Sequence, residues 1–328
     1  MSNLSTTHAD AAHRRLTVLV AAYNEASSLP LLHPLIRAAL DDVHGAHGIE
    51  TRVLYVDDGS HDATWSILQS FREQDPQVSV LRLSRNFGKE IALTAGLDQI
   101  EQGGVVILDA DGQDPPALIN SLVPYWLQGY DDVYGTRTNR DGELWFKRIT
   151  AKWFYRVIGH LSDTPIPADT GDFRLLSERA VQALGQLRER NRFMKGLFGW
   201  VGYNRISVPY SRAPRNAGKT KFNFRGLWNL ALDGITSFSL APLRIATYTG
   251  VVAALFAFAG MAFVMIRAAL YGDPVAGWPS MMAVILFIGG VQLLALGVIG
   301  EYLGRMYNES KQRPLYLVDQ QLPDRSGN

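Results

Sequence analysis

Residues 105–113 read VVILDADGQ, four aliphatic residues followed at once by an acidic, glycine-containing turn. Such a short apolar run is typical of a strand that is buried on both faces of a parallel sheet. Ligands of these sheets bind at the carboxyl ends of the strands, which is where Asp109 and Asp111 stand. Because side chains alternate along an extended backbone, Asp109, Asp111 and Gln113 can point to one side. The stretch therefore predicts a parallel sheet with a polar site at its carboxyl edge.

Three similar strands precede this one, and longer stretches that suit helices lie between them. Alternation of strands with helices indicates a parallel sheet with crossover connections, and so an α/β fold. Polar clusters follow two of the earlier strands, at 23–25 (YNE) and 57–60 (DDGS). We therefore expect three polar clusters at one edge of the sheet. The predicted strands are 16–22, 52–57, 78–83 and 105–109, and the predicted helices are 27–43, 62–74 and 89–102.

Composition excludes several classes of protein. The 328 residues suffice for about two domain-sized units. Lys and Arg number 32 against 31 Asp and Glu, a balance that excludes a strongly basic nucleic-acid binder, so no nucleic-acid partner is expected. The chain has no cysteine, which excludes disulfides, thiolate zinc sites and cysteine nucleophiles. No GxGxxG motif follows the first strand, which argues against a dinucleotide-binding fold.

The acidic turn has the composition of a metal site. Two carboxylates and an amide oxygen, from Asp109, Asp111 and Gln113, are hard ligands that suit Mg²⁺ or Mn²⁺. Such a site usually needs phosphate oxygens to complete the coordination shell, which points to a nucleoside diphosphate as the other ligand. The alternative is a solvated, aspartate-rich turn, since Asp and Gly are common in loops.

Two uncharged runs, 245–266 and 274–300, predict a pair of transmembrane helices at about 245–267 and 280–303. The alternative is a pair of buried core helices. Basic residues flank the outer ends of the pair, so the positive-inside rule places the catalytic domain and both termini in the cytoplasm. The chain is thus expected to be a multi-pass protein of the cytoplasmic (inner) membrane. These basic residues are Arg225, Arg244, Arg305, Lys311 and Arg313.

Two stretches, 144–158 and 222–238, mix aromatic and basic residues or show an apolar face at helical spacing. We expect them to lie in the headgroup plane of the membrane, with packing against the domain's own core as the alternative. The expected organisation is a flexible N-terminus (1–15), a catalytic domain (16–215), an acceptor loop with a juxtamembrane helix (216–243), the two spans (244–304) and a cytoplasmic tail (305–328).

Five motifs together resemble those of glycosyltransferase family 2, which has the GT-A fold. With the C-terminal pair of apolar helices, the chain is most similar to the GtrB-type polyprenyl-phosphate glucosyltransferases and the wider dolichol-phosphate-mannose-synthase-like group. One departure is Gly-Gln-Asp at 112–114, where Leu-Gln-His or Leu-Gln-Asn is commoner in the family. The motifs are AYNE at 22–25, VDDGS at 56–60, NFGK at 86–89, DADGQDPP at 109–116 and DTGDFRLL at 169–176.

The resemblance implies a set of site residues. The metal would be held on the donor diphosphate by Asp109, Asp111 and Gln113, and the catalytic residues would be Asp172 and Asp111. The nucleotide sugar would contact Ala22, Tyr23, Glu25, Asp57, Asp58, Lys89, Asp109 and Ala110. The acceptor phosphate would be bound by Arg137, Arg174, Arg212 and Lys219.

The same resemblance implies the reaction. We expect a membrane-bound inverting glycosyltransferase that moves glucose from UDP-glucose to undecaprenyl phosphate, as a homo-oligomer and by likeness a tetramer. Alternatives are the same reaction with GDP-mannose, UDP-GlcNAc or a UDP-aminoarabinose donor, and a non-catalytic membrane scaffold on a GT-A domain. A processive polysaccharide synthase would need more spans and a Gln-x-x-Arg-Trp motif, and the sequence has neither.

Overall fold

The computed structural model of the chain describes residues 15–137, 170–190, 192–210, 241–271 and 277–325. Strands and helices alternate through its first part, as predicted. In that part the elements are β1 (Arg15–Ala22), α1 (Leu29–His47), β2 (Glu50–Asp57), α2 (Thr64–Gln74), β3 (Val78–Leu83), α3 (Lys89–Leu97), β4 (Gly104–Asp109) and α4 (Ile119–Leu127). They are followed by β5 (Asp132–Arg137), β6 (Thr170–Leu176), α6 (Glu178–Gln186), α7 (Met194–Trp200), β7 (Arg205–Tyr210), α9 (Ala241–Tyr271), α10 (Trp278–Ser310) and β8 (Val318–Leu322).

The described strands form one mostly parallel sheet, in the order β7-β5-β6-β4-β1-β2-β3-β8. Strand β1 lies between β2 and β4 and runs parallel to both, and β2 runs parallel to β3. Strand β6 is antiparallel to its neighbours β4 and β5, and β8 is antiparallel to β3. The parallel sheet expected from the sequence is therefore confirmed. Its central strands also match the predicted ranges to within two residues at either end.

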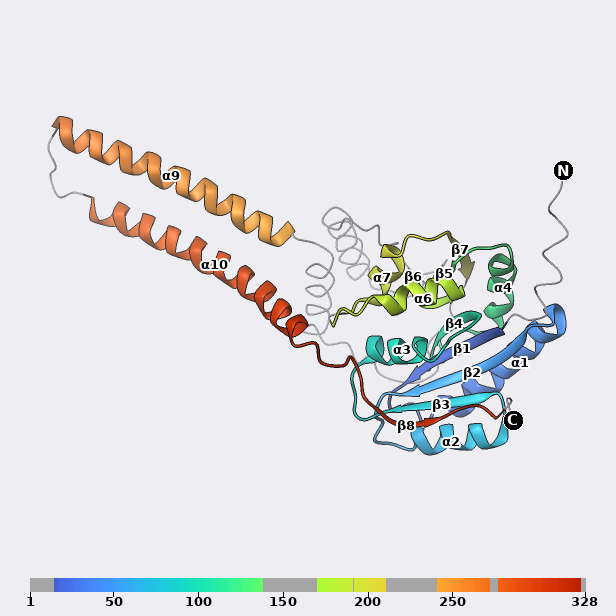
Figure 1. The fold of residues 1–328 in the computed structure, drawn as a ribbon. Helices are drawn as coiled ribbons and strands as arrows, with labels where there is room; N and C mark the ends of the chain where they lie inside the picture. The colour runs from blue at the N-terminus through green and yellow to red at the C-terminus, as the bar shows by residue number, and fades with distance from the viewer. Residues whose placement is uncertain (1–14, 138–169, 191, 211–240, 272–276, 326–328) are drawn as a thin grey trace, which may run out of the picture.

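Helices cover both faces of the sheet (Figure 1). Apolar side chains of α1, α2 and α4 pack on one face, and those of α3, α6 and α7 pack on the other. The central strand β1 contributes to both layers: Val18 and Val20 face the first, and Leu19 faces the second. Because both faces are buried, the strands read as continuous apolar runs, and the polar residues collect at the strand ends.

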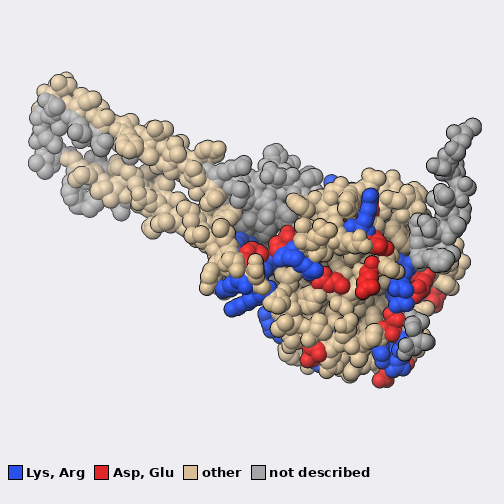
Figure 2. Space-filling view, in the orientation of Figure 1, with Lys and Arg blue, Asp and Glu red and all other residues tan. Residues whose placement is uncertain are grey.

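Two long helices, α9 and α10, lie side by side and project away from the sheet domain (Figure 1). Their surface carries large exposed apolar side chains, such as Phe256 and Leu294, and Figure 2 shows almost no charge along it. Among the described residues, Phe287–Ser310 of α10 is long and apolar enough to cross a membrane, with a mean hydropathy of 1.5 and none of it buried. Helix α9 contains a shorter apolar stretch, Ala246–Gly260.

Several sequence expectations fall on residues outside the described ranges. The two stretches expected at the membrane surface, 144–158 and 222–238, are among them, as is most of the expected acceptor loop and juxtamembrane helix. The same holds for nearly all of the expected N-terminal segment.

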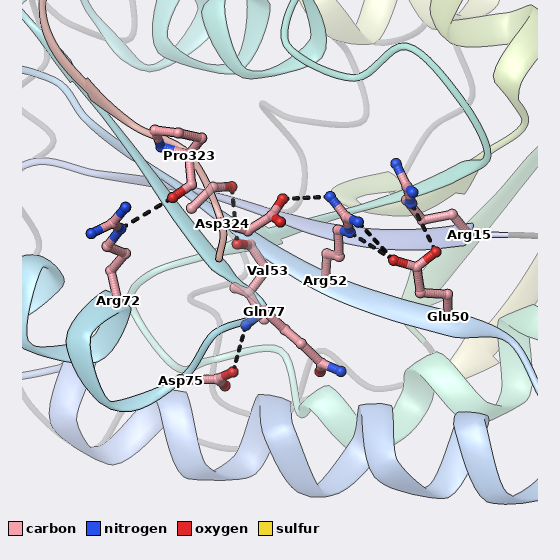
Figure 3. Close-up of polar contacts among 10 residues, drawn as sticks. Arg15, Glu50, Arg52, Val53, Arg72, Asp75, Gln77, Pro323 and Asp324 are labelled. Carbon is pink, nitrogen blue, oxygen red and sulfur yellow. Dashed lines mark hydrogen bonds and ion pairs between the residues drawn. The ribbon is translucent and has the colours of Figure 1, made fainter. Parts of the chain in front are cut away.

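The chain after α10, expected to be a tail, instead returns to the sheet. Strand β8 pairs with the outer edge of β3, from Val318 opposite Leu83 to Leu322 opposite Val80. Beyond β8, Asp324 forms an ion pair with Arg52, and Arg72 donates to the Pro323 carbonyl at 3.1 Å (Figure 3). An uncovered edge strand exposes a row of unpaired backbone groups. By pairing with β3, strand β8 provides hydrogen-bond partners for the backbone groups along that edge.

Truncation after Pro314 should destabilise the sheet domain, because it removes the β3–β8 ladder and leaves Arg52 without Asp324. We expect the free energy of unfolding to fall by about 2–4 kcal/mol, given about 1 kcal/mol per net hydrogen bond. Denaturant unfolding followed by tryptophan fluorescence measures this loss. Truncation after Arg325 is the matched control and should leave stability unchanged. Equal midpoints for both truncated chains would show that β8 contributes nothing.

Candidate active site

The three polar clusters predicted at one sheet edge do lie there. In the register of the sheet, Ala22 at the end of β1 is opposite Asp57 at the end of β2. On the other side of β1, Ala21 is opposite Asp109 at the end of β4. The carboxyl ends of three neighbouring strands thus bring the Tyr-Asn-Glu, Asp-Asp-Gly-Ser and Asp-Ala-Asp sequences side by side. In a parallel sheet this edge is the usual place for a ligand.

Hydrogen bonds join the loop after β1 to the loop after β2. The Asn24 backbone N–H donates to the Ser60 hydroxyl at 2.9 Å, and the Asn24 side-chain oxygen accepts from the His61 N–H at 2.9 Å. The Glu25 N–H donates to the Thr64 hydroxyl, also at 2.9 Å. Asn24 has a φ of 54°, a left-handed conformation that asparagine tolerates better than most residues. These bonds present Tyr23 at the surface, with 37% of its area exposed.

Both acidic residues at the end of β2 are buried and already engaged. Asp57 is fully buried, and its Oδ1 accepts the backbone N–H of Ser60 at 3.0 Å. Asp58 accepts the backbone N–H groups of Phe87 at 2.7 Å and Gly88 at 2.8 Å, one with each oxygen. In this structure Asp58 therefore fixes the loop that leads into α3, and Lys89 follows directly on that loop.

The ammonium group of Lys89 lies between two carboxylates from neighbouring strands. Its Nζ is 2.6 Å from Oδ1 of Asp109, and it also forms an ion pair with Oδ2 of Asp172. Asp172 is on β6, which is hydrogen-bonded to β4. Lys195, on α7, lies 3.9 Å from the other oxygen of Asp172. Two lysines and two aspartates from four elements thus form one charged cluster.

Negative charge and burial shape the acid–base properties of this cluster. Burial, with the nearby charges of Asp172 and Asp111, raises the pKa of Asp109, although Lys89 opposes the effect. Burial also acts to raise the pKa of Asp172, but Lys89 and Lys195 outweigh it and hold that pKa well below its usual range. The pKa of Lys89 is raised by its two aspartates, which outweigh desolvation. Asp172 and Lys89 are therefore both charged at neutral pH.

The oxygen ligands available at the end of β4, from Asp109, Asp111 and Gln113, are chemically suited to a divalent cation. Asp111 accepts the backbone N–H of Gln113 at 3.1 Å, which orders the turn that carries both residues. Over the described residues, no group of three His, Asp or Glu side chains gathers as a metal site. The chain thus brings two carboxylates and one amide, and a cation bound to them would need further oxygens from a ligand.

Arg174, which was expected to bind the acceptor phosphate, lies inside the domain. Arg174 is 3% exposed, and its guanidinium bonds Asp132 at 3.0 Å and lies 3.7 Å above the centre of the Phe198 ring. The expectation that it faces an acceptor phosphate does not agree with this burial. The physical reason is the alternation along β6, which puts Arg174 on the same face as Asp172 but one step deeper. There its charge helps to lower the pKa of Asp172.

The other expected acceptor residues are not described in side-chain detail. Arg137 is the last residue of β5, and Arg212 and Lys219 lie outside the described residues.

Sequence reasoning missed Lys195 and Glu90. Lys195 comes from α7, and no motif connects it with the aspartates, so only the fold brings it to Asp172. Glu90 follows Lys89 directly and accepts the backbone N–H of Met194 at 3.0 Å. Burial and the charge of Asp172 raise the pKa of Glu90 to about 7. Its position next to Lys89 was the available signal.

With this geometry established, comparison with known proteins assigns the family. Residues 17–185 match the model described as glycosyl transferase family 2. The chain belongs to glycosyltransferase family 2. It is accordingly an enzyme that transfers glycosyl groups. A second model, described as the GtrB C-terminal hairpin, matches residues 241–306, which contain α9 and most of α10. This match and the apolar α10 indicate membrane association.

Curated relatives cover almost the whole chain. An uncharacterised glycosyltransferase of Synechocystis sp. is 49% identical over 92% of this chain and 94% of its own length. The bactoprenol glucosyl transferase of Shigella phage SfV is 43% identical over 93% of this chain and 98% of its own length. A prophage bactoprenol glucosyl transferase homolog of Escherichia coli is 42% identical over the same shares.

Solved structures are more distant. The glucosyl-3-phosphoglycerate synthase of Mycobacterium tuberculosis, crystallised with Mn²⁺ and UDP-glucose, is 18% identical, with a TM-score of 0.44 over 72% of this chain and 82% of that one. A likeness at this level supports no further statement about this family 2 enzyme.

The raised pKa of Glu90 predicts a pH-dependent stability. The pKa of Glu90 is about 7 in the folded chain, against an ordinary value of 4.5 for glutamate. Between these values the folded state keeps a proton that the unfolded state releases, so stability falls as pH rises from 4.5 to 7. Glu90→Gln removes this titration, and should be about 1–2 kcal/mol more stable than the native chain at pH 8 but equal to it at pH 4.

Thermal unfolding at both pH values measures the effect. Glu73→Gln makes the same change on an exposed part of α2 and is the control. A stability gain for Glu90→Gln that is the same at pH 4 and pH 8 would contradict the assigned pKa.

Proposed function

We propose that the enzyme transfers glucose from UDP-glucose to a polyprenyl phosphate, undecaprenyl phosphate, and releases UDP. The observation that carries the proposal is the charged cluster at the carboxyl edge, where Lys89 lies between Asp109 and Asp172. An anionic donor and an anionic acceptor need both cations and ordered carboxylates at one place. Relatives above 40% identity are named bactoprenol glucosyl transferases, which supports the sugar and the lipid.

The donor side follows from the three strand ends. We assign the nucleotide sugar to Ala22, Tyr23, Glu25, Asp57, Lys89, Asp109 and Ala110, with Asp58 acting through the loop that it fixes. Asp109, Asp111 and Gln113 would hold Mg²⁺ or Mn²⁺. A divalent cation there would offset the charge that develops on the departing diphosphate. Burial is the main cause of the raised pKa of Asp109, and the charges of Asp172 and Asp111 add to it, so a cation bound there would stabilise the ionised carboxylates.

The reaction requires little proton transfer. A phosphate monoester has its second pKa near 6, so most of the acceptor is fully ionised at pH 7. A phosphate oxygen attacks the anomeric carbon, the bond from that carbon to the diphosphate oxygen breaks, and UDP leaves with inversion. Asp172, with its lowered pKa, is a poor general base. Its role in this proposal is to hold Lys89 and Lys195. Their ammonium groups would counter the negative charge of the donor diphosphate and of the acceptor phosphate.

The acceptor phosphate would be bound by Arg137, Arg212 and Lys219, whereas the buried Arg174 is paired with Asp132 and its charge helps to lower the pKa of Asp172. We also propose that α9 and α10 span the cytoplasmic membrane, with the catalytic domain and both termini in the cytoplasm. Support comes from the hairpin match and from the basic residues outside the two apolar runs. The tetramer implied by the resemblance stays a prediction.

Product formation tests the reaction directly. Purified enzyme in detergent, with Mg²⁺ or Mn²⁺, is offered undecaprenyl phosphate and one of five donors: UDP-glucose, UDP-galactose, UDP-GlcNAc, GDP-mannose or a UDP-aminoarabinose. We expect a lipid-linked hexose, detected by mass, from UDP-glucose alone. A product from another donor would move the assignment to that sugar. UDP binding without any glycolipid would show that the proposed acceptor is wrong.

Substitution of the metal-site aspartate tests the site. We expect Asp111→Asn to lower kcat at least 100-fold, because one of the two carboxylate ligands is lost, while folding and membrane insertion are unchanged. Asp172→Asn should lower it at least tenfold, because Lys89 and Lys195 lose a shared partner. Asp41→Asn, on the exposed face of α1, is the matched control. Full turnover by Asp111→Asn would refute the metal assignment.

A further inference from the structure

A cavity of about 750 Å³ lies where the hairpin meets the catalytic domain. Its walls come from the end of α10, from residues 312–316 that follow it, from the loop after α6, and from the residue after α3. The transfer reaction proposed above does not use this cavity. Its charged and aromatic lining consists of Asp98, Arg188, Arg190, Glu309, Arg313 and Tyr316.

Both acidic groups of the lining are already engaged. Asp98 Oδ2 accepts from the Arg188 guanidinium at 2.7 Å and from the Tyr316 hydroxyl at 2.9 Å. Glu309 Oε1 accepts the backbone N–H of Arg190 at 2.6 Å. Asp98 therefore joins the segment after α10 to the domain and neutralises Arg188, while Glu309 joins α10 itself to the loop after α6.

Two further arginines leave the cavity with surplus positive charge. Within the part of the chain that the structure describes, the guanidinium groups of Arg190 and Arg313 have no hydrogen bond or ion pair with protein. Nearby, the Lys311 ammonium lies 4.1 Å from the centre of the Tyr307 ring. Figure 2 shows basic side chains gathered at this junction, below the uncharged hairpin. The three arginines and two acids of the lining therefore leave the cavity with a net positive charge.

The cavity is separate from the reaction site. Helix α3 carries Lys89 at its first position, and Asp98 follows its last position. Nine residues of α-helix span about 14 Å. The two charged regions thus lie at opposite ends of one helix, too far apart for one phosphate to reach both.

We propose that this cavity binds the phosphate group of an anionic membrane lipid. Guanidinium groups bind phosphate oxygens in pairs of parallel hydrogen bonds, which suits Arg190 and Arg313. The apolar residues Pro314 and Leu315 form part of the same wall and suit the glycerol and the start of the acyl chains. The bound lipid would link the loop after α6 to the segment after α10, and so hold the hairpin against the domain.

The position of the cavity relative to the expected membrane surface agrees with a lipid headgroup as the ligand. The second predicted transmembrane helix ends at about Leu303. Ser310, the last residue of α10, follows seven residues later, about 10 Å further along the helix. The headgroup layer extends about 5–8 Å beyond the hydrocarbon on each side. Arg313 follows the end of α10 by three residues, and its long side chain can extend back to that layer. The inference rests on the membrane insertion in the proposed function, but not on the donor, the acceptor or the metal.

Short-chain lipids test the proposal on the full-length enzyme in an uncharged detergent. We expect dioctanoyl phosphatidylglycerol to raise Tm by several degrees, while dioctanoyl phosphatidylcholine and inorganic phosphate at the same concentrations do not. Arg190→Ala and Arg313→Ala should each raise the apparent Kd for phosphatidylglycerol at least fivefold. Arg325→Ala is the matched control, since it removes one exposed arginine beyond β8, and should stay within twofold.

Four results would overturn the proposal. A response to phosphatidylcholine equal to that of phosphatidylglycerol would show that the headgroup charge is not recognised. An equal response to inorganic phosphate would assign the cavity to a free anion. Equal weakening by Arg325→Ala would reduce the effect to general surface charge. Glucosyl transfer and vesicle flotation on the same samples keep the proposals distinct, because retained transfer and insertion without a lipid response refute only the lipid site.

Discussion

The site depends on the ammonium group of Lys89 between Asp109 and Asp172. Strands β4 and β6 lie next to each other, so their two aspartates stand close together at the end of the sheet. Without a cation between them, these half-buried carboxylates would repel each other and one would take up a proton. Lys89 is in turn placed by Asp58, which binds the two backbone N–H groups before it. The residue that directly follows β2 thereby helps to place the cation that lies between residues on β4 and β6.

The central part of the fold could be predicted from sequence because its signals are local. Strands β1 to β4 are apolar runs bounded by polar turns, and each is covered by a helix that follows it in the chain. The edge strands β7 and β8 lack this signal. In β7 exposed and half-exposed positions alternate, and β8 is exposed along almost its whole length. What makes them strands is the free edge of an existing neighbour, which is a property of the assembled sheet.

For the site, the sequence indicated which residues gather but not how each charge is used. The three clusters are at one edge, as their positions after strands predicted. Motif likeness could not show that Asp58 binds backbone groups or that Arg174 is buried on Asp132. The partners of Asp58 come from the loop before α3, whereas those of Arg174 depend on the register of β5 against β6, where Tyr134 is opposite Arg174, and on the place of α7. Lys195 was missed for the same reason, since α7 approaches β6 only in the folded chain.

The position of β8 has a consequence for synthesis of the protein on the ribosome. Leu83 at the end of β3 and Val318 of β8 are 235 residues apart in the chain. At 5–20 residues per second, β3 waits roughly 10–50 s for its partner after it has been made. During that interval the hairpin is translated, while the edge of β3 can pair with another nascent chain. Since β8 is attached to the end of α10, completion of the sheet follows the hairpin. A chain whose synthesis stops before β8 would therefore keep the open edge of β3.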